Sequence, residues 1–169
     1  AEAFLDQLVV WRGLAYTTAA VSTVPIDTIA ALPAWAQQTL GAHAKDPRPT
    51  LYERLQLETA STHDAVWNAA QREMLETGQM HTYLRMLWGK KILEWSPAPA
   101  DAMETMIALM NRYALDGRDP NSYAGYAWTL GRYDHPWPPA REIFGTVRYM
   151  SSANTVRKLK IKQYLTRFR

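Results

Sequence analysis

Apolar residues recur every three or four positions along most of the chain, a spacing that places side chains on one face of an α-helix. Phe4, Leu8 and Trp11 follow it near the start, and Trp88 and Trp95 lie seven residues apart, two turns along one helix. No segment alternates apolar and polar residues as a half-buried strand would. The pattern predicts an all-α fold, a helical bundle with long functional loops. We expect helices at residues 2–18, 32–40, 51–57, 64–77, 80–95, 101–113, 121–130, 141–149 and 155–168.

Local signals predict where several of these helices begin and end. Thr62 or Asp64 can cap the helix that runs to Thr77, and Gly78 can end it. Pro33 is acceptable in the first turn of the second helix. Residues 115–139 combine turn residues with many aromatic ones, which is typical of a functional loop.

Composition narrows the class of protein. The 169 residues fit one domain, and 47% of them are hydrophobic, so disorder is not expected. There is no cysteine, which excludes disulfides and thiolate chemistry. The longest uncharged stretch, residues 13–26, is too short and too polar to span a bilayer. No signal-peptide pattern is visible, so we expect an intracellular, cytoplasmic protein with no membrane partner. We also expect a monomer.

The net charge of +3 is unevenly distributed. Residues 141–169 contain eight Lys or Arg against one acid, Glu142. Such a tail could face phosphate, or it could be a solvated basic helix end.

Residues 63–95 hold the most unusual pattern, with three tryptophans, Trp67, Trp88 and Trp95, and with Arg85 three residues before Trp88. A cation and neighbouring indoles would suit a planar redox cofactor, although an aromatic stripe at helical spacing also suits a core. Arg85 needs a carboxylate if it is buried, and Asp116 and Asp119 can supply one. That pair could flank a flavin ring or be an ordinary ion pair between a helix and a loop.

Other chemistries have weaker support. Trp11 and Trp128 could stack on a nucleobase. The four histidines show no metal-ligand spacing, and no phosphate-binding glycine loop or hydrolase motif is present.

Three segments carry a resemblance to a known family. THDAVWNAAQREMLETGQMHTYLRMLWGKKILEW, NRYALDGRDPNSYAGYAWTLG and REIFGTVRYMS, with FLDQLVVWR near the start, closely resemble class II cyclobutane pyrimidine dimer photolyases. The resemblance covers nearly the whole chain and corresponds to the C-terminal part of the family's helical FAD-binding domain. It implies a deoxyribodipyrimidine photo-lyase that uses FAD to repair DNA containing pyrimidine dimers.

The resemblance also implies roles for particular residues. The electron relay would consist of Trp88 nearest the flavin, then Trp67, then Trp95. Cofactor-binding roles fall on four residues: the ring-flanking pair Arg85 and Asp116, Asn111 near flavin N5, and Asp119 in the same turn. Substrate-binding roles fall on Trp11, Tyr83, Met86, Trp128, His135 and Arg148.

In such enzymes light excites fully reduced FAD, one electron passes to the dimer, the cyclobutane ring splits, and the electron returns. Two positions depart from the family pattern. Gln7 stands where the family has a glutamate that hydrogen-bonds the dimer, and His135 replaces an arginine in the loop over the lesion. Glutamine keeps a hydrogen-bond donor but cannot supply a proton or a charge, so we expect weaker repair.

We further expect the chain to be one partial FAD-binding domain, residues 1–169, without the family's antenna domain and FAD-phosphate segment. The N-terminal part of the same enzyme would then be a partner. Two alternatives remain open. One is a cryptochrome-like flavin light sensor without repair, and the other is a truncated helical module that binds DNA without catalysis.

Overall fold

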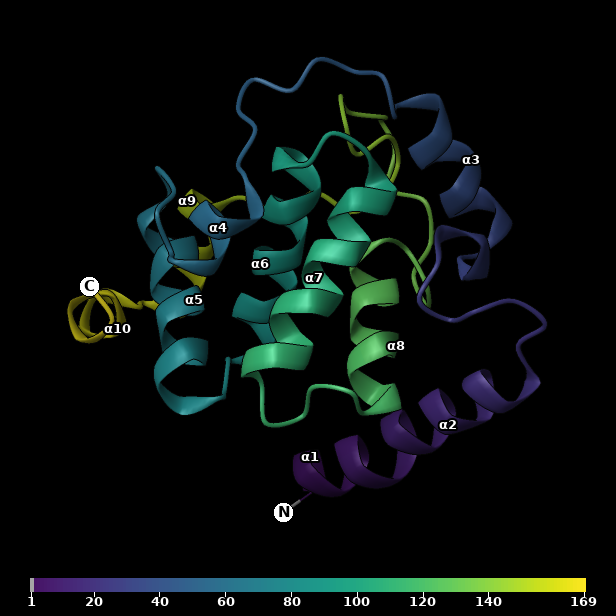
Figure 1. Cartoon of the computed structure of the whole chain (residues 1–169), viewed down its shortest axis with the longest axis horizontal. Helices are drawn as coiled ribbons and strands as arrows, with labels where there is room; N and C mark the ends of the chain where they lie inside the picture. Colours follow the sequence, from purple (N-terminus) through teal and green to yellow (C-terminus); the bar gives the residue numbers. More distant parts are fainter. Residues whose placement is uncertain (1) are drawn as a thin grey trace.

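The structure, a computed structural model, describes residues 2–169, with the side chain of residue 3 outside the described set. Its elements confirm the expected all-α class (Figure 1). In chain order they are α1 (Glu2–Leu5), the π-helix η1 (Asp6–Trp11), α2 (Arg12–Val21), the 3-10 helix η2 (Ile29–Ala31), α3 (Ala34–Ala42), α4 (Arg54–Glu58), α5 (Ala65–Thr77), α6 (Thr82–Trp95), α7 (Pro99–Tyr113), α8 (Pro120–Thr129), α9 (Ser152–Leu159) and α10 (Lys162–Arg167). Within the described residues, backbone pairing of the strand type is confined to an isolated bridge between Arg141 and Gly145.

Helix α6 lies at the centre and packs against α5, α7 and α8 (Figure 1). Gly89 permits this close approach, because a Cβ there would lie 2.7 Å from Cγ2 of Thr129 on α8 and 2.8 Å from Sδ of Met106 on α7. The helix is buried on most sides, as expected of a core element rather than an amphipathic surface one.

The two ends of α5 follow from interactions with nearby residues. The Asp64 carboxylate accepts hydrogen bonds from the backbone N–H groups of Val66 (3.0 Å) and Trp67 (3.1 Å), which caps α5. Gly78 ends α5 with a φ of 70°, a conformation that favours glycine. The side chain of Leu115 packs against this turn, so the loop after α7 is joined to the α5–α6 turn.

The first helical rod, from Glu2 to Val21, lies across one end of the bundle against α8 (Figure 1). Its middle turn, η1, is π-helical, a distortion that is frequent at functional sites. Large apolar side chains along the rod remain exposed, among them Phe4 (68%), Val9 (65%) and Val21 (71%). A contiguous apolar surface of this kind marks an interaction site in soluble proteins.

Three of the expected elements differ in the structure. Residues 141–149 do not form a helix: Ile143 and Gly145 have φ values of 69° and 52°. Hydrogen bonds to distant groups hold this segment instead, from Ile143 N to the Asp46 carboxylate (2.8 Å) and from Thr146 N to Thr39 Oγ1 (2.9 Å). The expected helix at 155–168 is two helices, because Lys160 adopts a left-handed conformation between α9 and α10. The expected helix at 51–57 is the shorter α4.

None of the helices within residues 2–169 combines the length and the apolar character that crossing a membrane requires.

Lys90 is a buried cation in the middle of α6, with 1% of its surface exposed. Its Nζ donates a hydrogen bond to the carbonyl oxygen of Thr129 at the end of α8. Burial lowers the pKa of Lys90 to about 7; the charge of Asp134 acts in the opposite direction and that of Arg148 in the same direction. The unfolded chain therefore binds one more proton than the folded chain between about pH 7 and the ordinary lysine pKa of 10.5.

This difference predicts that the fold becomes more stable as the pH rises through that window. Relative to a Lys90→Met variant, the free energy of unfolding of the unmodified chain should increase by about 1.4 kcal/mol per pH unit. Urea unfolding of both proteins between pH 6 and pH 10 measures the difference. A difference that stays constant across the series would contradict the lowered pKa.

Candidate functional site

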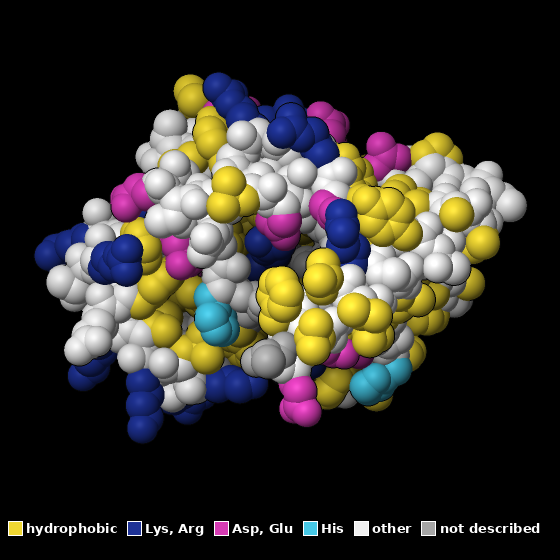
Figure 2. All heavy atoms as spheres, turned by 90° about the horizontal axis from the view of Figure 1, so that it is seen from below, with side chains coloured by type: hydrophobic (Ala, Val, Ile, Leu, Met, Phe, Trp, Pro, Cys, Tyr) yellow, Lys and Arg dark blue, Asp and Glu magenta, His cyan; other side chains and the backbone are white. Residues whose placement is uncertain are grey.

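A cavity of about 380 Å³ opens at the end of the bundle where α6 and α8 begin, beside the N-terminal rod. It is the hollow near the centre of the face in Figure 2. Its lining combines aromatic and thioether side chains with a few polar groups, as ligand sites do. The lining residues are Gln7, Thr82, Tyr83, Arg85, Met86, Asp116, Asn121, Gly125, Trp128, Arg148 and Met150.

Arg85 and Asp116 form a two-bonded ion pair in the wall of this cavity. Nη1 of Arg85 lies 2.6 Å from Oδ2 of Asp116, and Nη2 lies 3.0 Å from Oδ1. Burial alone raises the pKa of the Asp116 carboxyl, but the hydrogen bonds and the charge of Arg85 outweigh it, so the pKa is lowered. Ser122 Oγ donates to the backbone carbonyl of Asp116 (2.7 Å), which holds the loop against α8. The pair is thus ionised and oriented.

Asp119, the second carboxylate of the same turn, does not contact Arg85. It caps α8 by accepting from the N–H of Asn121 (2.9 Å), and it accepts from Nε of Arg12 on α2 (3.0 Å). That hydrogen bond and the charge of Asp119 raise the pKa of Arg12. Asp119 lines a second, adjoining hollow with Gln7 and Arg12, so it serves the packing of the N-terminal rod more directly than the cavity.

Asn111 lies outside the cavity lining. Its Nδ2 donates to the Tyr123 hydroxyl (2.9 Å), and its Oδ1 accepts from the N–H of Arg118 (2.9 Å). Both ends of the amide are therefore engaged within the protein, one by α8 and one by the loop that carries Asp116.

Trp88, Trp67 and Trp95 form one continuous aromatic stack in that order. The rings of Trp67 and Trp88 are 6.2 Å apart and nearly parallel, and Trp95 meets Trp67 edge-on at 5.6 Å. All three are buried. The indole N–H of Trp67 donates to the Trp88 carbonyl (3.0 Å), and that of Trp88 donates to Gln71 (2.9 Å), so both rings are held in one orientation.

The stack runs from near the cavity wall toward the surface of the protein. Trp88 follows Arg85 by three residues on α6, so the stack begins about one helical turn from the ion pair. At the other end, Trp95 contacts Tyr52 and the exposed His63 edge-on.

Trp11 and Trp128 stack directly on each other, with ring centroids 4.8 Å apart and planes inclined by 25°. Trp128 lines the cavity, and Trp11 stands behind it, held by a hydrogen bond from its indole N–H to Asp6 (3.1 Å). No space separates the two rings in this arrangement, so a base could enter between them only if they moved apart. Gln7 lines the cavity from η1, one turn before Trp11.

The remaining candidates divide into two groups. Tyr83, Met86 and Arg148 line the cavity. His135 does not: it is exposed and stacks on Trp137 (4.6 Å). The Arg148 guanidinium lies 4.7 Å from the centre of the same Trp137 ring.

Four lining residues were not expected from the sequence: Thr82, Asn121, Gly125 and Met150. A signal existed for two of them, because Asn121 and Gly125 precede Trp128 at helical spacing and share its face of α8.

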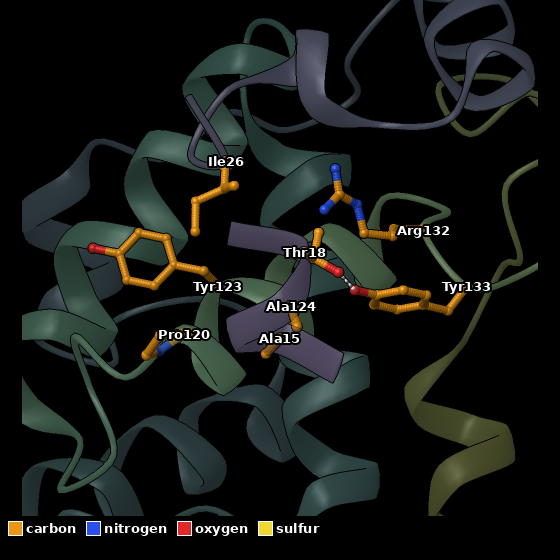
Figure 3. A pocket seen from close by; sticks show the side chains of 8 residues that line it. All are labelled: Ala15, Thr18, Ile26, Pro120, Tyr123, Ala124, Arg132 and Tyr133. Carbon is orange, nitrogen blue, oxygen red and sulfur yellow. Dashed lines mark hydrogen bonds between the residues drawn. The ribbon is translucent and has the colours of Figure 1, made fainter. Parts of the chain in front are cut away.

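A further, much smaller cavity of about 10 Å³ lies between α2 and α8 (Figure 3). Its walls include Ala15, Thr18 and Tyr123, and Thr18 Oγ1 lies 3.0 Å from the Tyr133 hydroxyl. This volume could hold at most a single water molecule. The N-terminal rod is therefore packed closely against α8 here, and the cavity does not provide a ligand site.

Among the described residues, no three His, Cys, Asp or Glu side chains come together as a metal site would require. The geometry therefore offers a mostly apolar cavity with one oriented ion pair and an aromatic stack behind it.

Comparisons with known proteins agree on one kind of protein. The chain is 50% identical over 166 residues to a deoxyribodipyrimidine photo-lyase of Methanothermobacter thermautotrophicus, covering 98% of this chain and 37% of that protein. It is 43% identical to one of Oryza sativa subsp. japonica, covering 98% of this chain and 32% of that protein. It is 50% identical over 131 residues to one of Potorous tridactylus, covering 77% of this chain and 24% of that protein. The chain thus spans about a quarter to about a third of the length of these relatives. No family model matches it.

Proposed function

We propose, since the chain belongs to the family of deoxyribodipyrimidine photo-lyases, that it forms the part of a light-driven DNA-repair enzyme that holds a flavin ring and a pyrimidine dimer. The observation that carries this proposal is the oriented Arg85–Asp116 pair in the wall of an apolar cavity, one helical turn from the tryptophan stack. On this proposal the protein acts on DNA that contains cyclobutane pyrimidine dimers.

The residues present fit a flavin ring. Arg85 donates hydrogen bonds to Asp116 only from its two terminal nitrogens, and its buried Nε has no hydrogen-bond partner within the described residues. An unpaired buried donor is costly unless a ligand or water satisfies it. Tyr83, Met86 and Trp128 supply flat or flexible apolar walls. When bound, reduced FAD would supply the electron that splits the dimer.

In this proposal the chain's own residues bind the flavin ring and the dimer, orient them, and connect the cavity wall to the surface. Arg85 holds positive charge beside the ring, and Asp116 keeps the guanidinium in one orientation. The Trp88–Trp67–Trp95 stack offers an aromatic path from the cavity wall toward the surface. Trp128 and Met150 exclude water from the dimer, and Arg148 offers a cation to its phosphates.

Gln7 provides the first test, because it lines the cavity from η1 and carries an amide where an acid would bond the dimer more strongly. Replacing Gln7 by glutamate should increase the quantum yield of dimer splitting by about fivefold, since a hydrogen bond involving a charged group contributes about 1 kcal/mol more than a neutral one. The yield is measured on a dimer-containing oligonucleotide under saturating binding. Gln38→Glu, on the exposed side of α3, is the matched control. No rise in a flavin-loaded Gln7→Glu protein would contradict the assigned position of Gln7.

The function itself is tested by reconstitution. The chain is refolded with FAD alone and, in parallel, with the remaining two thirds of the Methanothermobacter relative as a separate polypeptide. The second sample supplies a partner for the exposed apolar rod, Phe4 to Val21. We expect a bound-flavin absorption spectrum and light-dependent loss of dimers. Absence of bound flavin in both samples would sink the proposal.

Gln7 lines the cavity but can supply neither a proton nor a charge to the dimer. This favours a second candidate function, a flavin light sensor related to the photolyases. Photoreduction of bound flavin without dimer splitting, in both the unmodified chain and Gln7→Glu, would select this candidate.

A further inference from the structure

A fully buried amide lies between the tryptophan stack and helix α4. Gln71, in the middle of α5, has 0% of its surface exposed. Helix α5 packs directly on α6 (Figure 1), and the Gln71 side chain contacts Trp88 on one side and the end of α4 on the other. Burying an amide is costly unless its hydrogen bonds are satisfied, so these two partners are what keep Gln71 in the core.

The two partners also fix the orientation of the amide. Nε2 of Gln71 donates to the backbone carbonyl of Glu58 (3.2 Å), the last residue of α4, and Oε1 accepts from the indole Nε1 of Trp88 (2.9 Å). A carbonyl oxygen can only accept a hydrogen bond, and an indole N–H can only donate one. Turning the amide over would lose both bonds, so its oxygen faces the indole.

The indole of Trp67 meets the same kind of acceptor. Its N–H donates to the backbone carbonyl of Trp88 (3.0 Å), and its ring lies nearly parallel to the Trp88 ring. An amide oxygen is a good hydrogen-bond acceptor but a far weaker base than a carboxylate or an imidazole. An indole that is oxidised at either position therefore keeps its N–H proton.

We propose that Gln71 is a positioning residue for electron transfer: it orients the Trp88 ring and stabilises the positive charge that this ring carries after it gives up an electron. The inference rests on the proposed function and adds to it a residue outside the stack. In this step one electron leaves Trp88 for the bound, photoexcited flavin, and the N–H proton stays on the indole. One electron then moves from Trp67 to Trp88, which passes the positive charge along the stack.

The positive charge strengthens the hydrogen bond to Gln71. A bond from a charged donor is roughly twice as strong as one between neutral groups. The Gln71 oxygen therefore stabilises the oxidised form of Trp88 more than the neutral form, which makes the ring easier to oxidise. Both side chains are buried, so water does not weaken this interaction.

The test compares the unmodified chain with Gln71→Met and Gln71→Glu. Methionine keeps most of the length of the side chain but offers Trp88 no strong acceptor. Glutamate keeps an oxygen that accepts from Trp88 whether or not the carboxyl group is protonated. Gln79→Met is the matched control, because Gln79 is exposed in the turn after α5. Circular dichroism verifies that all four proteins are folded.

The first measurement needs no flavin. In the isotope-labelled chain, the indole N–H resonance of Trp88 is identified by its loss in a Trp88→Phe variant. In Gln71→Met this resonance should move upfield and exchange faster with solvent, because the proton has lost its acceptor. In Gln71→Glu it should stay near its original position. A Trp88 resonance that Gln71→Met leaves in place would overturn the proposal.

The second measurement follows photoreduction of the flavin in the reconstituted protein, at a fixed, limiting light intensity and with excess reductant. Photoreduction should be at least about fivefold slower in Gln71→Met, and within about twofold of the unmodified rate in Gln71→Glu and in the control. Flavin affinity should be the same in all four proteins, because Gln71 lies outside the cavity lining. A general disturbance of the core would instead weaken flavin binding together with photoreduction.

The inference and the proposed function fail in different ways. Equal rates of photoreduction in Gln71→Met and the unmodified chain, with flavin bound to both, would overturn the role of Gln71 alone. The same conclusion would follow if Gln71→Glu were as slow as Gln71→Met, or if Gln71→Met lost flavin affinity in step with its rate. Absence of bound flavin in the unmodified protein would overturn the proposed function and this inference with it.

Discussion

Replacing Trp67 by alanine is expected to lower the free energy of unfolding by about 3–5 kcal/mol. Trp67 is completely buried, and its ring stacks on Trp88 and meets Trp95. Truncation removes these contacts and leaves a cavity that the surrounding helices cannot fill. It also removes the indole N–H that donates to the Trp88 carbonyl. Urea unfolding, followed by far-ultraviolet circular dichroism, measures the loss.

Trp137→Ala is the control for this measurement, because that indole lies in a loop and is 39% exposed. Its replacement should change the free energy of unfolding by no more than about 1 kcal/mol. Equal losses for the two variants would show that the stack is not part of the stabilising core. A conservative Trp67→Phe variant, which keeps most of the packing, separates the two roles: on the proposed function it should slow photoreduction of bound flavin while leaving the fold intact.

Replacing Arg85 by methionine is expected to weaken flavin binding by roughly tenfold to a hundredfold, since a hydrogen bond to a charged group contributes about 1.5–3 kcal/mol. Methionine keeps the length and apolar character of the side chain but removes the guanidinium beside the cavity. Without Arg85, the hydrogen bonds and the charge that Arg85 contributes toward lowering the pKa of Asp116 are lost, so the pKa should shift upward. Quenching of flavin fluorescence during titration measures the dissociation constant.

The control is Arg54→Met, which removes an ion pair with Glu104 in which both side chains are largely exposed. Exposed pairs of this kind contribute about 0–1 kcal/mol, and this one lies outside the cavity lining. Flavin affinity should be unchanged. An Arg85→Met protein that binds flavin as tightly as the control would show that the ion pair holds the loop and not the ring.

The two best-predicted elements, α5 and α6, show what local information achieves. Asp64 and Gly78 mark the ends of α5 through interactions within a few residues, and α6 is bounded by that turn and by Ser96. Signals of this range are readable without a structure. The segment at 141–149 shows the limit, since its apolar residues match a helix but its backbone is held by Asp46 and Thr39, about a hundred residues away.

The candidate site likewise combines features that the sequence alone reveals with features that depend on contacts between distant residues. The residues of the Trp67–Trp88–Trp95 stack stand out because three tryptophans within 29 residues are conspicuous in any sequence. Residue type and spacing leave open whether Arg85 pairs with Asp116 or with Asp119, because both acids lie in one turn; only the family resemblance implied Asp116. The structure resolves it: Asp119 is engaged by Arg12 and the start of α8, which leaves Asp116 for Arg85.

By itself, therefore, the sequence determined the helical class, most helix ends, and the residue types able to hold a planar cofactor beside an aromatic path. These depend on spacing, capping and side-chain chemistry, which act over one or two turns. Only the tertiary structure showed that Asp116 and not Asp119 faces Arg85, that Trp11 rests on Trp128, and that the basic tail bends at Lys160. Those choices depend on competition between groups far apart in the chain, and they exist only once the helices are packed.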